Sequence, residues 1–130
     1  MRFHKSTCYA LYATLELARH DRPITVGEVA SRYEIPEGAL AKVFQRLIHG
    51  GIATGVRGVG GGHVLARPKE SITMLDVIAI FEAPMPCSLS SATPMRLPEG
   101  QGCPIENLLR EVEQTARDTF ASVTLETLIR

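Results

Sequence analysis

The clearest pattern of hydrophobic and polar positions lies between residues 40 and 48. Apolar side chains recur there at positions i, i+3, i+4, i+7 and i+8, which are Leu40, Val43, Phe44, Leu47 and Ile48. This spacing predicts an amphipathic helix with one buried face. Gly50 and Gly51 follow and predict the end of the helix, because glycine adopts the left-handed conformation at a helix C-terminus without steric cost.

Two short apolar runs, residues 52–56 and 63–66, enclose a glycine-rich stretch and predict a β-hairpin. Many such stretches are only turns. A phosphate-binding loop is disfavoured, because the stretch lacks the Lys-Ser/Thr pair of a P-loop and follows a helix rather than opening one. A helix followed by a hairpin with Arg57 near its tip favours a recognition helix and its wing. Arg57 would then enter a minor groove or contact phosphate.

The residues before this helix predict two more helices. Residues 5–20 carry apolar side chains at helical spacing along one side: Cys8, Leu11, Tyr12, Leu15 and Ala18. Thr25 and Glu28 match a capping box, which opens a short helix over residues 26–33. A short helix, a tight turn and a longer amphipathic helix in this order predict a helix-turn-helix.

The residues after the hairpin predict a fourth helix, a loop and a long C-terminal helix. Thr73 and Asp76 match a second capping box, and the helix that they open continues through Glu82. Residues 84–104 are rich in proline, serine and glycine and lack periodicity, which predicts a long loop of the kind that is often functional. An apolar stripe then begins, with Ile105, Leu108, Leu109, Val112, Ala116, Phe120 and Val123. The stripe suits a helix–helix dimer interface, and packing on the chain's own domain is the alternative.

Composition narrows the class of protein. A chain of 130 residues predicts one domain, or a small domain with an appendage. The sequence has neither a long apolar run nor a signal-peptide core, so we expect a cytoplasmic protein and no membrane partner. Residues 1–70 hold ten Lys/Arg against six Asp/Glu, and residues 71–130 hold four against eight. The basic first half suits a polyanion such as DNA.

Residues 56–65 resemble the wing motif V-R-G-P-G-G-G-Y-x-L of the IscR/NsrR-type regulators, the Rrf-two family. Residues 1–10 are similar to the M-R-L…Y-A start of that family, and residues 72–78 to its I-x-x-x-x-V-I segment. Its helix motif L-x-x-x-F-x-R-L is matched by Leu40, Phe44, Arg46 and Leu47. The resemblance implies a mostly α fold, a winged helix-turn-helix with a small hairpin wing and a long C-terminal dimerisation helix. It also implies a homodimeric bacterial transcription regulator of double-stranded operator DNA.

On this resemblance residues 1–83 form the DNA-binding domain, residues 84–104 a cysteine-bearing sensor loop, and residues 105–130 the dimerisation helix and C-terminal tail. Lys42 and Gln45 are polar candidates for reading base edges, and Ala41 is placed to touch a thymine methyl group. Phosphate contacts are expected from both helices before the recognition helix. The expected DNA-binding residues are Arg2, Lys5, Ser31, Arg32, Gly38, Ala39, Lys42, Gln45, Arg57, Gly58, Gly60 and Gly61.

Many members of that family hold an iron–sulfur cluster in the loop before the last helix, usually with three cysteines. This chain has two there, Cys87 and Cys103, and its remaining cysteine is Cys8. In some relatives the first helix of the partner subunit donates a ligand at or near this position, although Cys8 also suits a core residue. Glu106 and His4 are the candidates for the fourth ligand. The resemblance thus implies a 2Fe–2S cluster, with 4Fe–4S as the alternative.

Two hypotheses for regulation follow. In the first, a cluster that senses redox, iron or nitric oxide status controls operator affinity. In the second, a clusterless repressor responds to redox through a reversible disulfide between Cys87 and Cys103. An enzyme is disfavoured, because the sequence shows neither a nucleophile–base set nor a metal-hydrolase motif.

Overall fold

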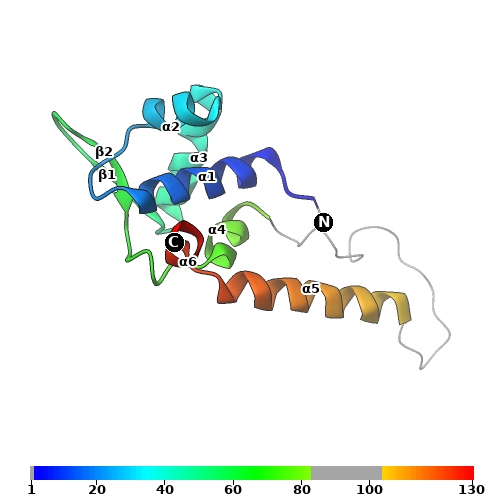
Figure 1. Cartoon of the computed structure of the whole chain (residues 1–130). Helices are drawn as coiled ribbons and strands as arrows, with labels where there is room; N and C mark the ends of the chain where they lie inside the picture. Colours follow the sequence, from blue (N-terminus) through cyan, green and yellow to red (C-terminus); the bar gives the residue numbers. More distant parts are fainter. Residues whose placement is uncertain (1, 83–103) are drawn as a thin grey trace.

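The computed structural model describes residues 2–82 and 104–130. Its helices, apart from the long one over residues 104–122, surround one core, and a hairpin projects from it (Figure 1). The elements in chain order are α1 (Lys5–Arg19), α2 (Val26–Tyr33), α3 (Glu37–His49), β1 (Ala53–Val56), β2 (Gly62–Leu65), α4 (Met74–Phe81), α5 (Pro104–Ser122) and α6 (Leu125–Ile129). This architecture confirms the predicted fold class. No helix within these two ranges is both long and apolar enough to cross a membrane.

Helix α1 lies at the centre of the fold and packs against α3, α4 and α6. The predicted buried side of α1 is wrong in part: the fully buried positions include Ala10, Ala13 and Thr14, whereas Tyr12 is half exposed. Small side chains at the buried positions let three helices approach α1 closely. Tyr12 instead lies on the ring of Tyr33, with 5.1 Å between the ring centroids.

The predicted apolar face of α3 is confirmed, and it supplies Leu40, Val43, Phe44 and Leu47 to the core. The predicted end of the helix at the glycine pair is also confirmed. The backbone N–H of Gly50 donates to the carbonyl of Arg46 at 2.9 Å, and Gly50 has a φ of −79°. The left-handed residue of the pair is Gly51, with a φ of 75°.

The two predicted capping boxes form to different extents. At α4 the box is complete: the Asp76 N–H donates to the Thr73 hydroxyl at 3.1 Å, and the Thr73 N–H donates to the Asp76 carboxylate at 2.9 Å. At α2 the Glu28 N–H donates to the Thr25 hydroxyl at 3.1 Å, but the Glu28 carboxylate pairs with Arg22 at 3.0 Å. The Glu28 carboxylate thus has a charged partner that the sequence pattern did not predict.

The wing consists of β1 and β2, paired antiparallel from Ala53 opposite Leu65 to Val56 opposite Gly62. Ile24, between α1 and α2, adds a bridge to the hairpin, because its N–H and carbonyl exchange hydrogen bonds with His63 at 2.9 and 2.8 Å. A Cβ atom at Gly62 would lie 2.7 Å from the Ile24 carbonyl oxygen. Glycine is therefore required where the wing joins the helical body.

The C-terminus returns to the core through α6, an element that the sequence pattern did not predict. The Leu125 N–H donates to the Ile72 carbonyl at 2.9 Å, and the Met74 N–H donates to the Val123 carbonyl at 2.8 Å. The Leu125 side chain is fully buried. These contacts fix the C-terminal end of α5 beside α4, and the rest of α5 extends away from the helical body (Figure 1).

Candidate nucleic-acid interface

The face of α3 opposite its buried face is exposed. It presents five of the side chains or backbone positions considered for DNA contact: Gly38, Ala39, Ala41, Lys42 and Gln45. Lys42 and Gln45 lie three residues apart and share one side of the helix. An exposed helix with a cation and an amide at this spacing can place both groups at base edges in a major groove.

The wing presents Arg57 at its exposed tip, together with Gly58 and Gly60. Gly61, the other expected contact in the wing, is half-buried, and its N–H donates to the Gly58 carbonyl at 3.0 Å. A Cβ atom at Gly61 would lie 2.8 Å from that same carbonyl oxygen, so the tight tip depends on this glycine. The tip thereby carries one exposed guanidinium on a narrow hairpin.

His63 lies where the wing meets the recognition helix. Its ring is 4.6 Å from the ring of Phe44, measured between centroids. Its Nδ1 atom is buried and lacks a hydrogen-bond partner within the part of the chain that the structure describes. Burial lowers the pKa of His63 below 6.5, against a smaller opposing effect of the backbone of Ile24. The neutral imidazole therefore packs half-buried against the core residue Phe44.

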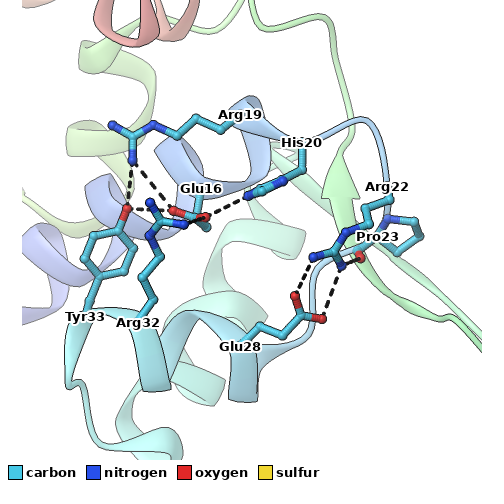
Figure 2. Close-up of polar contacts among 8 residues, drawn as sticks. All are labelled: Glu16, Arg19, His20, Arg22, Pro23, Glu28, Arg32 and Tyr33. Atoms are coloured by element: carbon cyan, nitrogen blue, oxygen red, sulfur yellow. Dashed lines mark hydrogen bonds and ion pairs between the residues drawn. The ribbon is translucent and has the colours of Figure 1, made fainter.

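Helix α2 carries Ser31 and Arg32, both exposed. The structure gives Arg32 a partner that the sequence did not predict, because its guanidinium lies 3.2 Å from the carboxylate of Glu16 on α1. Figure 2 shows this contact among the residues at the C-terminal end of α1. Arg32 is thus held in place from within the protein while its side chain remains 57% exposed.

Glu16 is the centre of this polar cluster, with a side chain only 4% exposed (Figure 2). Its carboxylate accepts hydrogen bonds from the Tyr33 hydroxyl at 2.7 Å and from His20 Nε2 at 2.8 Å. Burial raises the pKa of Glu16, but the hydrogen bonds from Tyr33 and His20 and the charge of Arg32 outweigh that effect. The net pKa lies below the usual value of 4.5. Glu16 therefore stays ionised and joins α1 to α2.

The start of α1 carries Arg2 and Lys5, both exposed. In Figure 1 this end of α1 is the end opposite the wing. Its backbone is held by Glu82, whose carboxylate accepts from the His4 N–H at 2.7 Å and from the Thr7 hydroxyl at 2.8 Å. The geometry gives Arg2 and Lys5 access to solvent at a distance from the hairpin tip.

The expected cluster ligands are only partly described. Cys87 and Cys103 lie outside the described residues. Cys8 is half-buried in α1, and its N–H donates to the His4 carbonyl at 3.3 Å, one helical turn before it. Glu106 is exposed in the first turn of α5. Within residues 2–82 and 104–130, no three histidine, cysteine or acidic side chains gather as a metal site would require.

Sequence reasoning missed three charged residues that organise this surface: Glu16, Arg46 and Glu82. Glu16 and Glu82 are buried, and each has a partner on another helix: Tyr33 lies 17 residues from Glu16, and Thr7 lies 75 residues from Glu82. Helical periodicity carries no signal for such pairs. Arg46 belongs to the family's helix motif L-x-x-x-F-x-R-L, but the motif does not predict its hydrogen bond to the Ile80 carbonyl.

Comparisons with known proteins agree with this arrangement. A model of the Rrf2 family, described as "Iron-dependent Transcriptional regulator", matches residues 3–130. The HTH-type transcriptional regulator BadM of Rhodopseudomonas palustris is 36% identical over 131 residues, which cover 100% of this chain and 82% of BadM. The regulator IscR of Xenorhabdus nematophila is 29% identical over 136 residues, covering 100% of this chain and 80% of IscR.

The fold is also similar to a solved structure. CymR, the global cysteine regulator of B. subtilis, superposes with a TM-score of 0.81 at 24% identity, over 99% of this chain and 96% of CymR. The relatives are transcriptional regulators, which agrees with the expectation that the chain is not an enzyme. Since the family model spans nearly the whole sequence and BadM shares more than a third of its residues, the chain belongs to the Rrf2 family of DNA-binding transcriptional regulators.

Proposed function

We propose that this chain is a homodimeric regulator that binds two half-sites of double-stranded operator DNA and responds to the state of its cysteines. The observation that carries the DNA-binding mode is the exposed side of α3 beside a wing with an exposed Arg57. Residues 1–83 are the DNA-binding domain of this proposal, residues 84–104 its sensor segment, and residues 105–130 its dimerisation element. Two copies would place two recognition helices on the same duplex.

The homodimer is supported by an apolar face on α5. Ile105, Leu108 and Val112 lie on one side of the helix at spacings of three and four residues, and their exposed fractions are 60%, 59% and 46%. A contiguous apolar stripe of this kind is stabilised when another helix covers it. A second copy of α5 supplies a matching stripe, because a two-fold interface brings the same surface of both subunits together.

The sensing group that we propose is an iron–sulfur cluster held by Cys87, Cys103 and Cys8 of the partner subunit, with Glu106 or His4 as the fourth ligand. Thiolates are the preferred ligands of such clusters, and a cluster supplies a redox-active iron centre when it is bound. The description of the family as iron-dependent supports this choice. We favour a 2Fe–2S cluster, with 4Fe–4S as the alternative. Cys8 is half-buried rather than fully buried, which is compatible with a ligand at the surface of α1.

The second candidate is a clusterless thiol switch, in which Cys87 and Cys103 form a reversible disulfide. It is supported by the same two cysteines in a segment rich in proline, serine and glycine. This candidate needs neither Cys8 nor iron. The two mechanisms can therefore be distinguished by the iron content of the protein and by the effect of replacing Cys8.

The test begins with purification of the full chain without oxygen, followed by visible absorption spectra and iron and sulfide analysis. The cluster predicts a coloured protein with iron and acid-labile sulfide, and loss of colour in Cys8→Ala as in Cys87→Ala. A colourless wild type, even after reconstitution, would contradict the cluster and leave the thiol switch. Colour that survives Cys8→Ala unchanged would make Cys8 a core residue.

DNA binding is tested on the same preparations with operator fragments selected from random double-stranded DNA. Specific and salt-dependent binding is expected, because phosphate contacts release counterions. Absence of any sequence-selective binding in both reduced and oxidised preparations would contradict the proposed function.

A further inference from the structure

The last turn of α4 contacts two elements that are far apart in the sequence. On one side, Arg46 of α3 donates from Nη2 to the Ile80 carbonyl at 2.6 Å, and its guanidinium carbon lies 4.3 Å from the centre of the Phe81 ring. The same turn meets the end of α3 again, since a Cβ atom at Gly50 would clash with the Ile80 side chain. The recognition helix α3 and helix α4 are thus joined by a charged hydrogen bond, a cation–π contact and close packing.

On its other side, this turn is joined to α1 by Glu82. The Glu82 side chain is 3% exposed and accepts from the His4 N–H at 2.7 Å and the Thr7 hydroxyl at 2.8 Å. Both donors belong to the N-terminal turn of α1, where backbone N–H groups lack partners within the helix and the helix dipole favours a negative charge. The imidazole of His4 lies 3.5 Å from the same carboxylate. Glu82 therefore acts as the cap that α1 lacks within its own sequence.

These contacts fall on three consecutive residues, Ile80, Phe81 and Glu82. Phe81 and Glu82 are both buried, so the turn is packed in place as well as hydrogen-bonded. Residues 83–103, with Cys87 and Cys103, follow Glu82 directly in the chain. The chain therefore continues directly from this turn into the cysteine-bearing segment. The same turn contacts both α3 and α1, the helix that carries Cys8.

We propose that Arg46 and Glu82 are positioning residues that make the last turn of α4, the end of α3 and the start of α1 move as one unit. The regulatory role of this unit rests on the proposed function. A change of state in the segment after Glu82 then reaches the recognition helix through Ile80 and Arg46, and it reaches Cys8 through Glu82 and Thr7. Packed and hydrogen-bonded contacts transmit such a shift because they switch between discrete arrangements and do not deform continuously.

The test is amide hydrogen exchange on the full chain without DNA. Glu82→Gln and Thr7→Val remove contacts at α1, and Arg46→Met removes the donor at α3 while keeping an apolar side chain beside Phe81. If the unit exists, Glu82→Gln and Thr7→Val raise exchange at the amides of residues 46–50 by at least about threefold, although the hydrogen bonds that they remove join α4 to α1 and not to α3. Reciprocally, Arg46→Met raises exchange at Thr7 and Cys8 by a similar factor.

Matched controls are Glu113→Gln and Arg117→Met, which remove a surface ion pair within α5. They should leave exchange in α1 and α3 unchanged. Changes confined to the element that carries each substitution would overturn the proposal. Thr7→Val keeps the test decisive if Glu82→Gln prevents folding, because it removes only one hydroxyl donor from the carboxylate.

A second measurement separates this inference from the proposed function. Operator affinity is compared between reduced and oxidised protein for wild type and Arg46→Met. The inference predicts that the ratio of the two affinities falls toward one in the variant. A wild-type ratio of one would refute the proposed sensing function, while the exchange result would still decide whether the three elements are coupled.

Discussion

The hydroxyl of Tyr33, at the end of α2, donates a 2.7 Å hydrogen bond to the buried carboxylate of Glu16 in α1. This contact crosses from the first helix to the helix-turn-helix, and His20 and Arg32 bind the same carboxylate. The buried charge of Glu16 therefore helps to fix α2, and with it Ser31 and Arg32, in addition to the packing of Val29 and Ala30 in the core. The contribution of the Glu16 charge to the free energy of unfolding can be measured.

Glu16→Gln is expected to lower the free energy of unfolding by about 1–2 kcal/mol near neutral pH. The amide retains the shape of the side chain but loses the charge that Arg32 and His20 face. The loss stays moderate because the side chain of Arg32 is 57% exposed and can be hydrated. Urea denaturation of wild type and variant measures the difference.

The same variant makes a prediction about pH. Because the pKa of Glu16 is lowered in the folded state, its ionised form stabilises the fold above the unfolded value near 4.5, and this stability is lost as pH falls through the folded-state pKa. The difference between wild type and Glu16→Gln should therefore shrink in acid. Glu28→Gln, which removes an exposed ion pair with Arg22, is the control and should change stability little. Equal effects of the two substitutions would contradict a central role for Glu16.

Arg57→Ala is expected to weaken operator binding by about 1–3 kcal/mol if the guanidinium reads a base or a narrow groove. If Arg57 meets phosphate instead, the salt slope of binding falls by about 1. The melting temperature should stay near that of wild type, since Arg57 is exposed at the wing tip. Fluorescence anisotropy over a salt series distinguishes the two contacts. With Arg117→Ala as the control, unchanged affinity of Arg57→Ala would remove the wing from the interface.

Replacement of Leu108 and Val112 together by aspartate is expected to convert the dimer to a folded monomer. Both side chains are exposed in the single chain, so the charges cost little there, but they would be buried in a helix–helix interface at a cost of several kcal/mol. Light scattering and circular dichroism measure assembly and folding. Arg110→Asp with Gln114→Asp places charges on the opposite side of α5 and should leave the dimer intact. A wild type that is monomeric at micromolar concentration would refute the homodimer.

We expect the protonation of His63 to lower the stability of the folded protein in mild acid. Its pKa is lowered in the folded state, so the unfolded chain binds the proton more readily, and stability falls as pH drops below about 6.5. His63→Phe keeps an aromatic ring beside Phe44 and removes the titrating group. Between about pH 7 and pH 5.5, wild type should lose more stability than this variant. His49→Gln, an exposed histidine at the end of α3, should follow the wild-type curve. Parallel curves for wild type and His63→Phe would show that another group is responsible.

The sequence by itself determined the elements that depend on local spacing. The apolar positions of α3 at i, i+3, i+4 and i+7 specified both the helix and its buried face, because side chains at those positions share one side of a helix. The capping residues Thr25 and Thr73 specified where α2 and α4 begin, and the glycines specified the hairpin. The family motif covered the same positions and pointed to DNA.

Only the tertiary structure decided which groups meet across the fold. Tyr12 faces Tyr33 rather than the core, Arg32 pairs with Glu16 while presenting its side chain to solvent, and Leu125 returns from the C-terminus to fill the core beside α1. Glu82 caps a helix that begins more than seventy residues earlier in the chain, with its partner Thr7 at a separation of 75 residues. Periodicity reports the faces of single helices, whereas a buried carboxylate must find its donors wherever packing brings them, since an unpaired buried charge is too costly to keep.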